Sequence, residues 1–120
     1  MASGPAVFHI TKDDNVLKGQ RRRFAIVVTD NNGNRQQMSG WTMIWRLYAY
    51  RGAATPLVTI SGANISFDST LSDATLDKVI VLCDNNTLDD APIGKLYHKA
   101  SRTDNDNEGD VVHGDFWLLG

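Results

Sequence analysis

The stretch "WTMIWRLYAY", from Trp41 to Tyr50, decides the fold class of this chain. It is rich in aromatic and large apolar residues, which pack well on a pleated surface, and its side chains alternate between two faces as they do in a β-strand. Trp41, Met43 and Trp45 share one of these faces. We therefore predict a strand over residues 41–50 whose Trp41, Met43 and Trp45 face lies in the core.

Segments in which apolar and polar residues alternate also flank this stretch on both sides, and turn residues separate these segments at short intervals. Phe24, Ile26 and Val28 share one face of the run before it, which should end at the turn "DNNG". Many short strands separated by turns are typical of an all-β sandwich or barrel. The other predicted strands cover residues 6–11, 21–30, 57–61, 64–68, 75–83, 94–103 and 110–120, with a short turn or a one-turn helix at 84–92.

Two of these strands carry a more specific prediction. "KVIVLC", which ends at Cys83, is apolar on both sides of the alternation and is predicted to be buried on both faces. The last two runs are separated by the polar "DNDNEG", and we predict that they form a hairpin.

The length and composition fit one globular domain, over residues 1–120. The chain has 42% hydrophobic and 22% charged residues, enough apolar surface to build a core. Its formal net charge of −2 gives no overall field that would attract nucleic acid. No apolar run reaches the roughly 20 residues that span a bilayer, and the N-terminus lacks the pattern of a signal peptide. We expect a soluble protein, made in the cytoplasm of a cell, with neither a membrane nor nucleic acid as its main partner.

The acidic segment "TDNDNEGD", Thr103 to Asp110, allows two interpretations. Asp104, Asp106, Glu108, Gly109 and Asp115 fall near the positions of a helix–loop–helix calcium loop. That loop needs a helix on each side and a long carboxylate at its last position, whereas here the flanks are strand-like and the last position is an aspartate. The sequence favours a solvated hairpin turn, and a weak cation site built from Asp104, Asp106 and Glu108 is the alternative.

No catalytic, cofactor-binding or metal-ligating residue can be assigned from the remaining motifs. The histidines His9, His98 and His113 lie on separate predicted strands without metal-ligand spacing, so we interpret His98 and His113 as half-exposed sheet residues. Cys83 lies in an apolar run and is predicted to be an inert core residue. Arg21–Arg23 is predicted to be a solvated strand start rather than a patch for phosphate or an acidic protein. No nucleophile motif or phosphate-binding glycine loop occurs.

Four motifs in order give the sequence a resemblance to a known family. These are "TDNNG" at a strand end, "SGWT" opening the aromatic strand, "LCDNNTLDDAPIGKLYHKA" as a turn leading into a Tyr-bearing strand, and the closing "HGDFWLL". The chain resembles the small immunoglobulin-like β-sandwich domains of tailed-bacteriophage virion proteins, including the N-terminal domain of upper baseplate proteins of lactococcal phages. The resemblance implies a single immunoglobulin-like antiparallel β-sandwich with an acidic, variable tip on its last hairpin.

The resemblance also implies a function. We expect a non-enzymatic virion structural protein that needs no cofactor, binds other virion proteins and is present in many copies in a symmetric assembly. Baseplate adaptors continue into a linker and a trimerising or receptor-binding part, which this sequence does not contain. An accessory capsid (decoration) protein is therefore the favoured interpretation, and a tail, baseplate or head–tail adaptor is the alternative.

Two further questions stay open at the level of sequence. Residues 1–7 could form an N-terminal arm that adds a strand to a neighbour, or the first strand of the chain's own sandwich. A small hydrolase or a carbohydrate-binding module is the second alternative function, because exposed aromatic rings on a sheet can stack on sugars. Exposed rings at Trp41, Trp45 and Trp117 would favour sugar binding, and buried rings would favour a scaffold.

Overall fold

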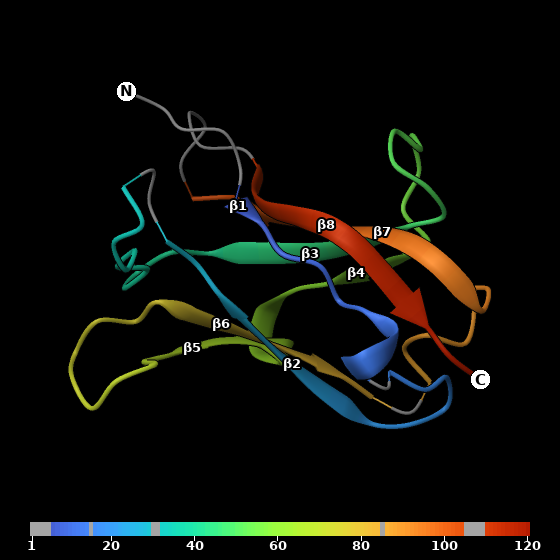
Figure 1. Ribbon diagram of the computed structural model, residues 1–120, viewed down its shortest axis with the longest axis horizontal. Coiled ribbons are helices and arrows are strands. Elements are labelled where there is room, and N and C mark those ends of the chain that lie inside the picture. Colours follow the sequence, from blue (N-terminus) through green and yellow to red (C-terminus); the bar gives the residue numbers. More distant parts are fainter. Residues whose placement is uncertain (1–5, 15, 30–31, 85, 105–109) are drawn as a thin grey trace.

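Two β-sheets pack face to face around one apolar core and form an all-β sandwich (Figure 1). The structure is a computed structural model that describes residues 6–14, 16–29, 32–84, 86–104 and 110–120. The five-stranded sheet contains, in spatial order, β1 (Ala6–Val7), β8 (Asp110–Leu118), β7 (Gly94–Arg102), β3 (Met43–Tyr48) and β4 (Val58–Ile60). The three-stranded sheet contains β2 (Arg22–Val27), β6 (Lys78–Cys83) and β5 (Ile65–Asp68). Short 3-10 turns lie at Lys12–Asp14 and Gly62–Asn64.

The strand order is that of an immunoglobulin-like sandwich. The neighbours β2, β6 and β5 take the places of strands B, E and D, and β3, β7 and β8 take those of C, F and G. All of these pairs are antiparallel. The first strand differs from the constant-type arrangement, because β1 runs parallel to β8 instead of joining the sheet of β2.

Trp45 lies at the centre of the core. Its side chain is 0% exposed, and its ring lies 5.9 Å from the ring of Phe24, 5.6 Å from that of Phe116 and 6.1 Å from that of His98. Immunoglobulin domains also place a buried tryptophan on strand C, against a disulfide between strands B and F. In this chain Phe24 from β2 and His98 from β7 contact the tryptophan instead.

The alternation of side chains along β3 and β2 predicted correctly which face of each strand points into the core. Met43 and Trp45 of β3 are buried. The inward-pointing side chains of β2 and β6 are buried as well. Trp41 precedes β3 and packs half-buried against the core. The predicted inward set of the second run is confirmed as well: Phe24, Ile26 and Val28 are all buried.

Two strand predictions are corrected by the structure. Only Val79, Val81 and Cys83 of β6 are buried, while the opposite face is half-exposed because no further layer covers the three-stranded sheet. The strand predicted over residues 6–11 is interrupted after Val7. It continues as an isolated parallel bridge from Ile10 to Phe116 and then turns, where the Asp14 carboxylate accepts a hydrogen bond from the Thr11 N–H at 2.7 Å.

The order of turn and hairpin after β6 follows the sequence prediction. Residues 86–90 are turns, with hydrogen bonds such as that from the Thr87 N–H to the Asp84 carbonyl at 3.1 Å. β7 and β8 form the predicted antiparallel hairpin, with a bulge at Ala100/Ser101. Within the part of the chain that the structure describes, no helix is long and apolar enough to cross a membrane.

Candidate functional site

The outer face of the five-stranded sheet concentrates the charged and aromatic side chains of three adjacent strands. β3, β7 and β8 each turn every second residue into the core, and the intervening residues point away from it. Cross-strand register places Arg46 opposite Lys99, Tyr48 opposite Tyr97 and Lys99 opposite His113. We call this set the outer sheet face: Ile44, Arg46, Tyr48, Lys95, Tyr97, Lys99, Ser101, His113, Asp115 and Trp117.

Local contacts hold several of these side chains in place. The Tyr97 hydroxyl and the His113 Nδ1 share a hydrogen bond of 2.5 Å, and the Ser101 hydroxyl donates to the Asp110 carboxylate at 2.6 Å. The Lys99 ammonium lies 3.5 Å from the same Asp110 carboxylate. Such contacts limit the side-chain entropy that a partner would have to remove on binding.

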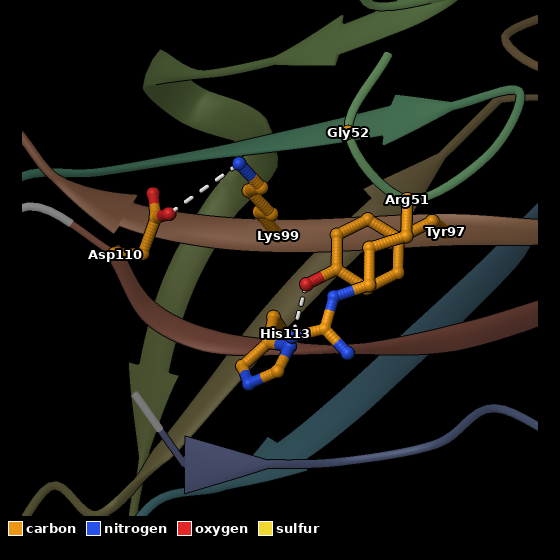
Figure 2. A pocket seen from close by; sticks show the side chains of 6 residues that line it. All are labelled: Arg51, Gly52, Tyr97, Lys99, Asp110 and His113. Carbon is orange, nitrogen blue, oxygen red and sulfur yellow. Dashed lines mark hydrogen bonds and ion pairs between the residues drawn. The ribbon is translucent and has the colours of Figure 1, made fainter. Parts of the chain in front are cut away.

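The loop between β3 and β4 projects from the sheet (Figure 1), and its residues Arg51 and Gly52 line a pocket. The Arg51 guanidinium carbon lies 5.9 Å from the centre of the Tyr97 ring, close enough for a cation–π contact. Figure 2 shows Arg51 and Gly52 entering from the loop, Tyr97 and Lys99 from β7, and Asp110 and His113 from β8. The pocket has a volume of about 330 Å³.

A second hollow adjoins the first. It has a volume of about 460 Å³ and shares Arg51 and Tyr97 with the first pocket, while Tyr50, Lys95 and Asp115 complete its polar lining. Tyr50 is 66% exposed. Arg51, which is exposed, and Tyr97, which is buried, therefore line both hollows.

The electrostatics of the first pocket are dominated by Arg51. Among the described residues no carboxylate forms an ion pair with its guanidinium, whereas Lys99 has Asp110 and Lys95 has Asp115 at 3.7 Å. Burial lowers the pKa of His113, and the Arg51 charge lowers it further. Within the described structure, a neutral imidazole beside a guanidinium without a carboxylate partner leaves the pocket positive and able to accept an anion.

The carboxylates of the acidic segment that the structure describes do not converge. Asp104 accepts hydrogen bonds from the Arg102 guanidinium at 2.9 Å and from the Thr42 N–H at 3.0 Å, and these contacts lower the pKa of Asp104 to about 2. Asp115 lies on β8 beside His9 and Lys95. Asp106, Glu108 and Gly109 lie outside the described residues. The described part of the chain contains no cluster of three metal-ligating side chains.

The structure corrects the prediction for one histidine. His98 was predicted to be half-exposed, but it is 0% exposed, because it shares the inward face of β7 with Leu96 and Ala100. Burial lowers the pKa of His98 to about 4. His113 is half-buried, as predicted, and His9 is exposed.

The predictions for Cys83 and the arginine cluster agree with the structure. Cys83 is fully buried, and desolvation raises the pKa of its thiol to about 12, so it is an unreactive core residue. Arg21 and Arg23 are exposed, whereas Arg22 is half-buried and its guanidinium donates to the Asp14 carbonyl.

The tryptophans form no open aromatic platform. Trp45 is buried in the core, and the two others are half-buried. The Arg102 guanidinium carbon lies 4.0 Å from the centre of the Trp41 ring, and the Lys12 ammonium lies 4.5 Å from that of the Trp117 ring. A cation therefore lies over the ring of each partly exposed tryptophan.

Sequence reasoning missed both Arg51 and the cluster around Arg35. Arg51 lies in the segment "RGAATP", which has no periodicity, and its partner Tyr97 is far away in the sequence. The Arg35 guanidinium donates to Asp77 at 2.9 Å and to Asp73 at 2.6 Å, and so joins the loop before β3 to the loop before β6. These contacts raise the pKa of Arg35 and lower the pKa values of both carboxyls. This second cluster fastens loops together and leaves its charges paired.

No family model matches this chain, and no curated protein is similar enough to it to count as a relative.

Proposed function

We propose that the protein is a non-enzymatic structural protein of a tailed-bacteriophage virion, an accessory capsid protein that binds other virion subunits through its outer sheet face. The observation that carries the proposal is the arrangement of this face. Aromatic and charged side chains from β3, β7 and β8 are held in place there by one another and lie beside a positive pocket. A binding surface gains affinity when its side chains are ordered before the partner arrives.

The virion assignment rests on the sequence resemblance, and the immunoglobulin-like strand order supports it. In the sequence, the resembling motifs follow β2, directly precede β3, run from the end of β6 into β7, and lie in β8. These are strands and turns that define the order of the sandwich. A tail, baseplate or head–tail adaptor built on the same domain is the alternative within the same class.

The position of the contact follows from the distribution of exposed side chains. Large exposed apolar side chains of the described residues come from four different segments, at Val27, Tyr50, Leu71 and Ile93. The outer sheet face is a more continuous candidate, because its residues are neighbours in the sheet register. For sugar binding, the cations over Trp41 and Trp117 compete with stacking, and so the carbohydrate alternative has less support.

The proposed role of residues 1–7 as an arm is a separate point. Ala6 and Val7 pair with Val112 and His113 of the same chain, and residues 1–5 lie outside the described residues. Deletion of Ala2 to Val7 should weaken attachment and leave the fold intact if the segment is an arm. The same deletion should destabilise the domain if the segment serves as an internal strand.

Attachment to particles tests the proposed function. Purified protein is mixed with virions that lack it, and the amount that sediments with the particles is measured. Wild-type protein should bind, and Arg46→Glu, which reverses a charge on the outer sheet face, should reduce binding about tenfold or more. Arg23→Glu makes the same change on a strand of the other sheet and should have little effect. Failure of the wild type to bind heads or tails, or equal loss in both variants, would contradict the proposal.

A further inference from the structure

The guanidinium of Arg51 is a charged group without an acidic partner in the described structure. It is exposed, and its described contact is with the ring of Tyr97. The contact restricts the guanidinium while leaving its N–H groups available, since a cation–π contact uses the flat side of the group. Two parallel N–H groups of an arginine match the two oxygens of a carboxylate.

The pair of Tyr97 and His113 supplies a further donor in either tautomer. If the tyrosine hydroxyl donates to Nδ1 at 2.5 Å, the imidazole carries its proton on Nε2. If Nδ1 carries the proton and donates, the tyrosine hydroxyl is free to donate elsewhere. Arg51, Tyr97 and His113 line the same pocket, so the guanidinium and this pair lie together around one hollow (Figure 2).

The surrounding charges favour a single anionic group over a polyanion. Asp110 lies beside Lys99, and Asp115 lies beside Lys95, so each of these lysines is already offset by a carboxylate. The same aspartates would repel the closely spaced phosphates of a nucleic acid, whose binding depends on many unpaired cations. A volume of about 330 Å³ has room for one acidic side chain.

We propose that the pocket between Arg51 and His113 binds a carboxylate of an acidic segment of the partner protein, which anchors that segment on the outer sheet face. This inference rests on the proposed function and names the chemistry of the partner. Charge complementarity selects the occupant: the pocket offers a guanidinium that has no carboxylate partner among the described residues, together with a neutral donor, and a carboxylate satisfies both.

The test uses the full chain and short peptides. The isotope-labelled protein is titrated with a hexapeptide of Asp and Glu, with the matching Asn and Gln hexapeptide, and with inorganic phosphate, while the His113 ring signals are followed by NMR. The acidic peptide should bind and raise the pKa of His113. Arg51→Gln should weaken its binding about tenfold or more, and Arg23→Gln should leave it unchanged. Equal binding of the amide peptide, tighter binding of phosphate, or no effect of Arg51→Gln would overturn the pocket assignment.

The two proposals can fail separately. If wild-type protein attaches to virions but no acidic peptide binds, the pocket assignment is overturned and the proposed function stands. If the peptide binds at Arg51 and virions do not take up the protein, the assignment of the pocket as a carboxylate site stands. The proposal that the partner is a virion protein is then overturned. Loss of both attachment and peptide binding in Arg51→Gln would support the full inference.

Discussion

The indole Nε1–H of Trp45 donates a hydrogen bond to the Nδ1 of His98 at 3.1 Å, across the neighbouring strands β3 and β7. Because an indole can only donate, Nδ1 must be unprotonated, and the His98 proton lies on Nε2. Nε2 in turn donates to the Phe8 carbonyl at 2.6 Å. A neutral imidazole thus connects the centre of the core with the N-terminal segment.

This arrangement predicts a loss of stability in mild acid. Burial lowers the pKa of His98 to about 4, below the ordinary value of 6.5, so the unfolded chain binds a proton more readily than the folded protein does. The resulting stability is complete above pH 6.5, decreases as the pH falls toward 4, and changes no further below that. The loss should be on the order of 3 kcal/mol.

Urea unfolding at pH 7.5 and pH 4.5 measures this loss, and an NMR titration follows the His98 ring directly. His113→Gln should keep most of the pH dependence, although the pKa of His113 is also lowered. The pKa values of Asp73, Asp77 and Asp104 are lowered too. The stability that these carboxylates contribute to the fold is lost only below about pH 4. A His98 ring that titrates near pH 6.5 would contradict the prediction.

Truncation of Trp45 should come close to unfolding the protein. Trp45→Ala removes a fully buried ring and its hydrogen bond to His98, and should cost about 3–5 kcal/mol. Tyr50→Ala removes a largely exposed ring and should change the free energy of unfolding by less than about 0.5 kcal/mol. Equal unfolding midpoints for the two variants in urea would show that Trp45 is not at the centre of the core.

Gly114 should not tolerate even a methyl group. A Cβ at this position would clash with the Phe8 carbonyl oxygen, and Gly114→Ala should therefore push the N-terminal segment away from β8 and from His98. We expect a loss of about 1–3 kcal/mol. In a chain that lacks residues 2–9 the carbonyl is absent, and the same substitution should cost much less. An equal cost in both chains, measured by chemical denaturation, would rule out the contact.

Calcium should have little effect on the protein. The described carboxylates Asp104 and Asp115 are already engaged by different partners on different elements. A ligand stabilises a protein according to the logarithm of its concentration over its dissociation constant, so millimolar calcium should shift the melting temperature by less than about 5 °C. A larger rise that disappears when Asp104→Ala and Asp106→Ala are combined would overturn the hairpin interpretation of the acidic segment.

Local alternation was sufficient to predict most of the strands and the inward face around Trp45, but not the interruption of the first strand after Val7. It also contained the signal for His98, which alternates with Leu96 and Ala100, although a histidine on a strand was interpreted as half-exposed. Alternation says nothing about which strands become neighbours. The parallel pairing of β1 with β8 and the position of Arg51 over Tyr97 depend on long-range contacts, and for that reason the sequence did not predict them.

The location of the protein in purified particles tests the central claim most directly. Virions are purified through a density gradient, analysed by mass spectrometry, and imaged by electron cryomicroscopy. We predict that the protein is present in multiple copies in a symmetric arrangement, with its five-stranded sheet facing a neighbouring virion subunit. Recovery of the protein only in infected-cell lysate, and never in the purified particles, would contradict the account.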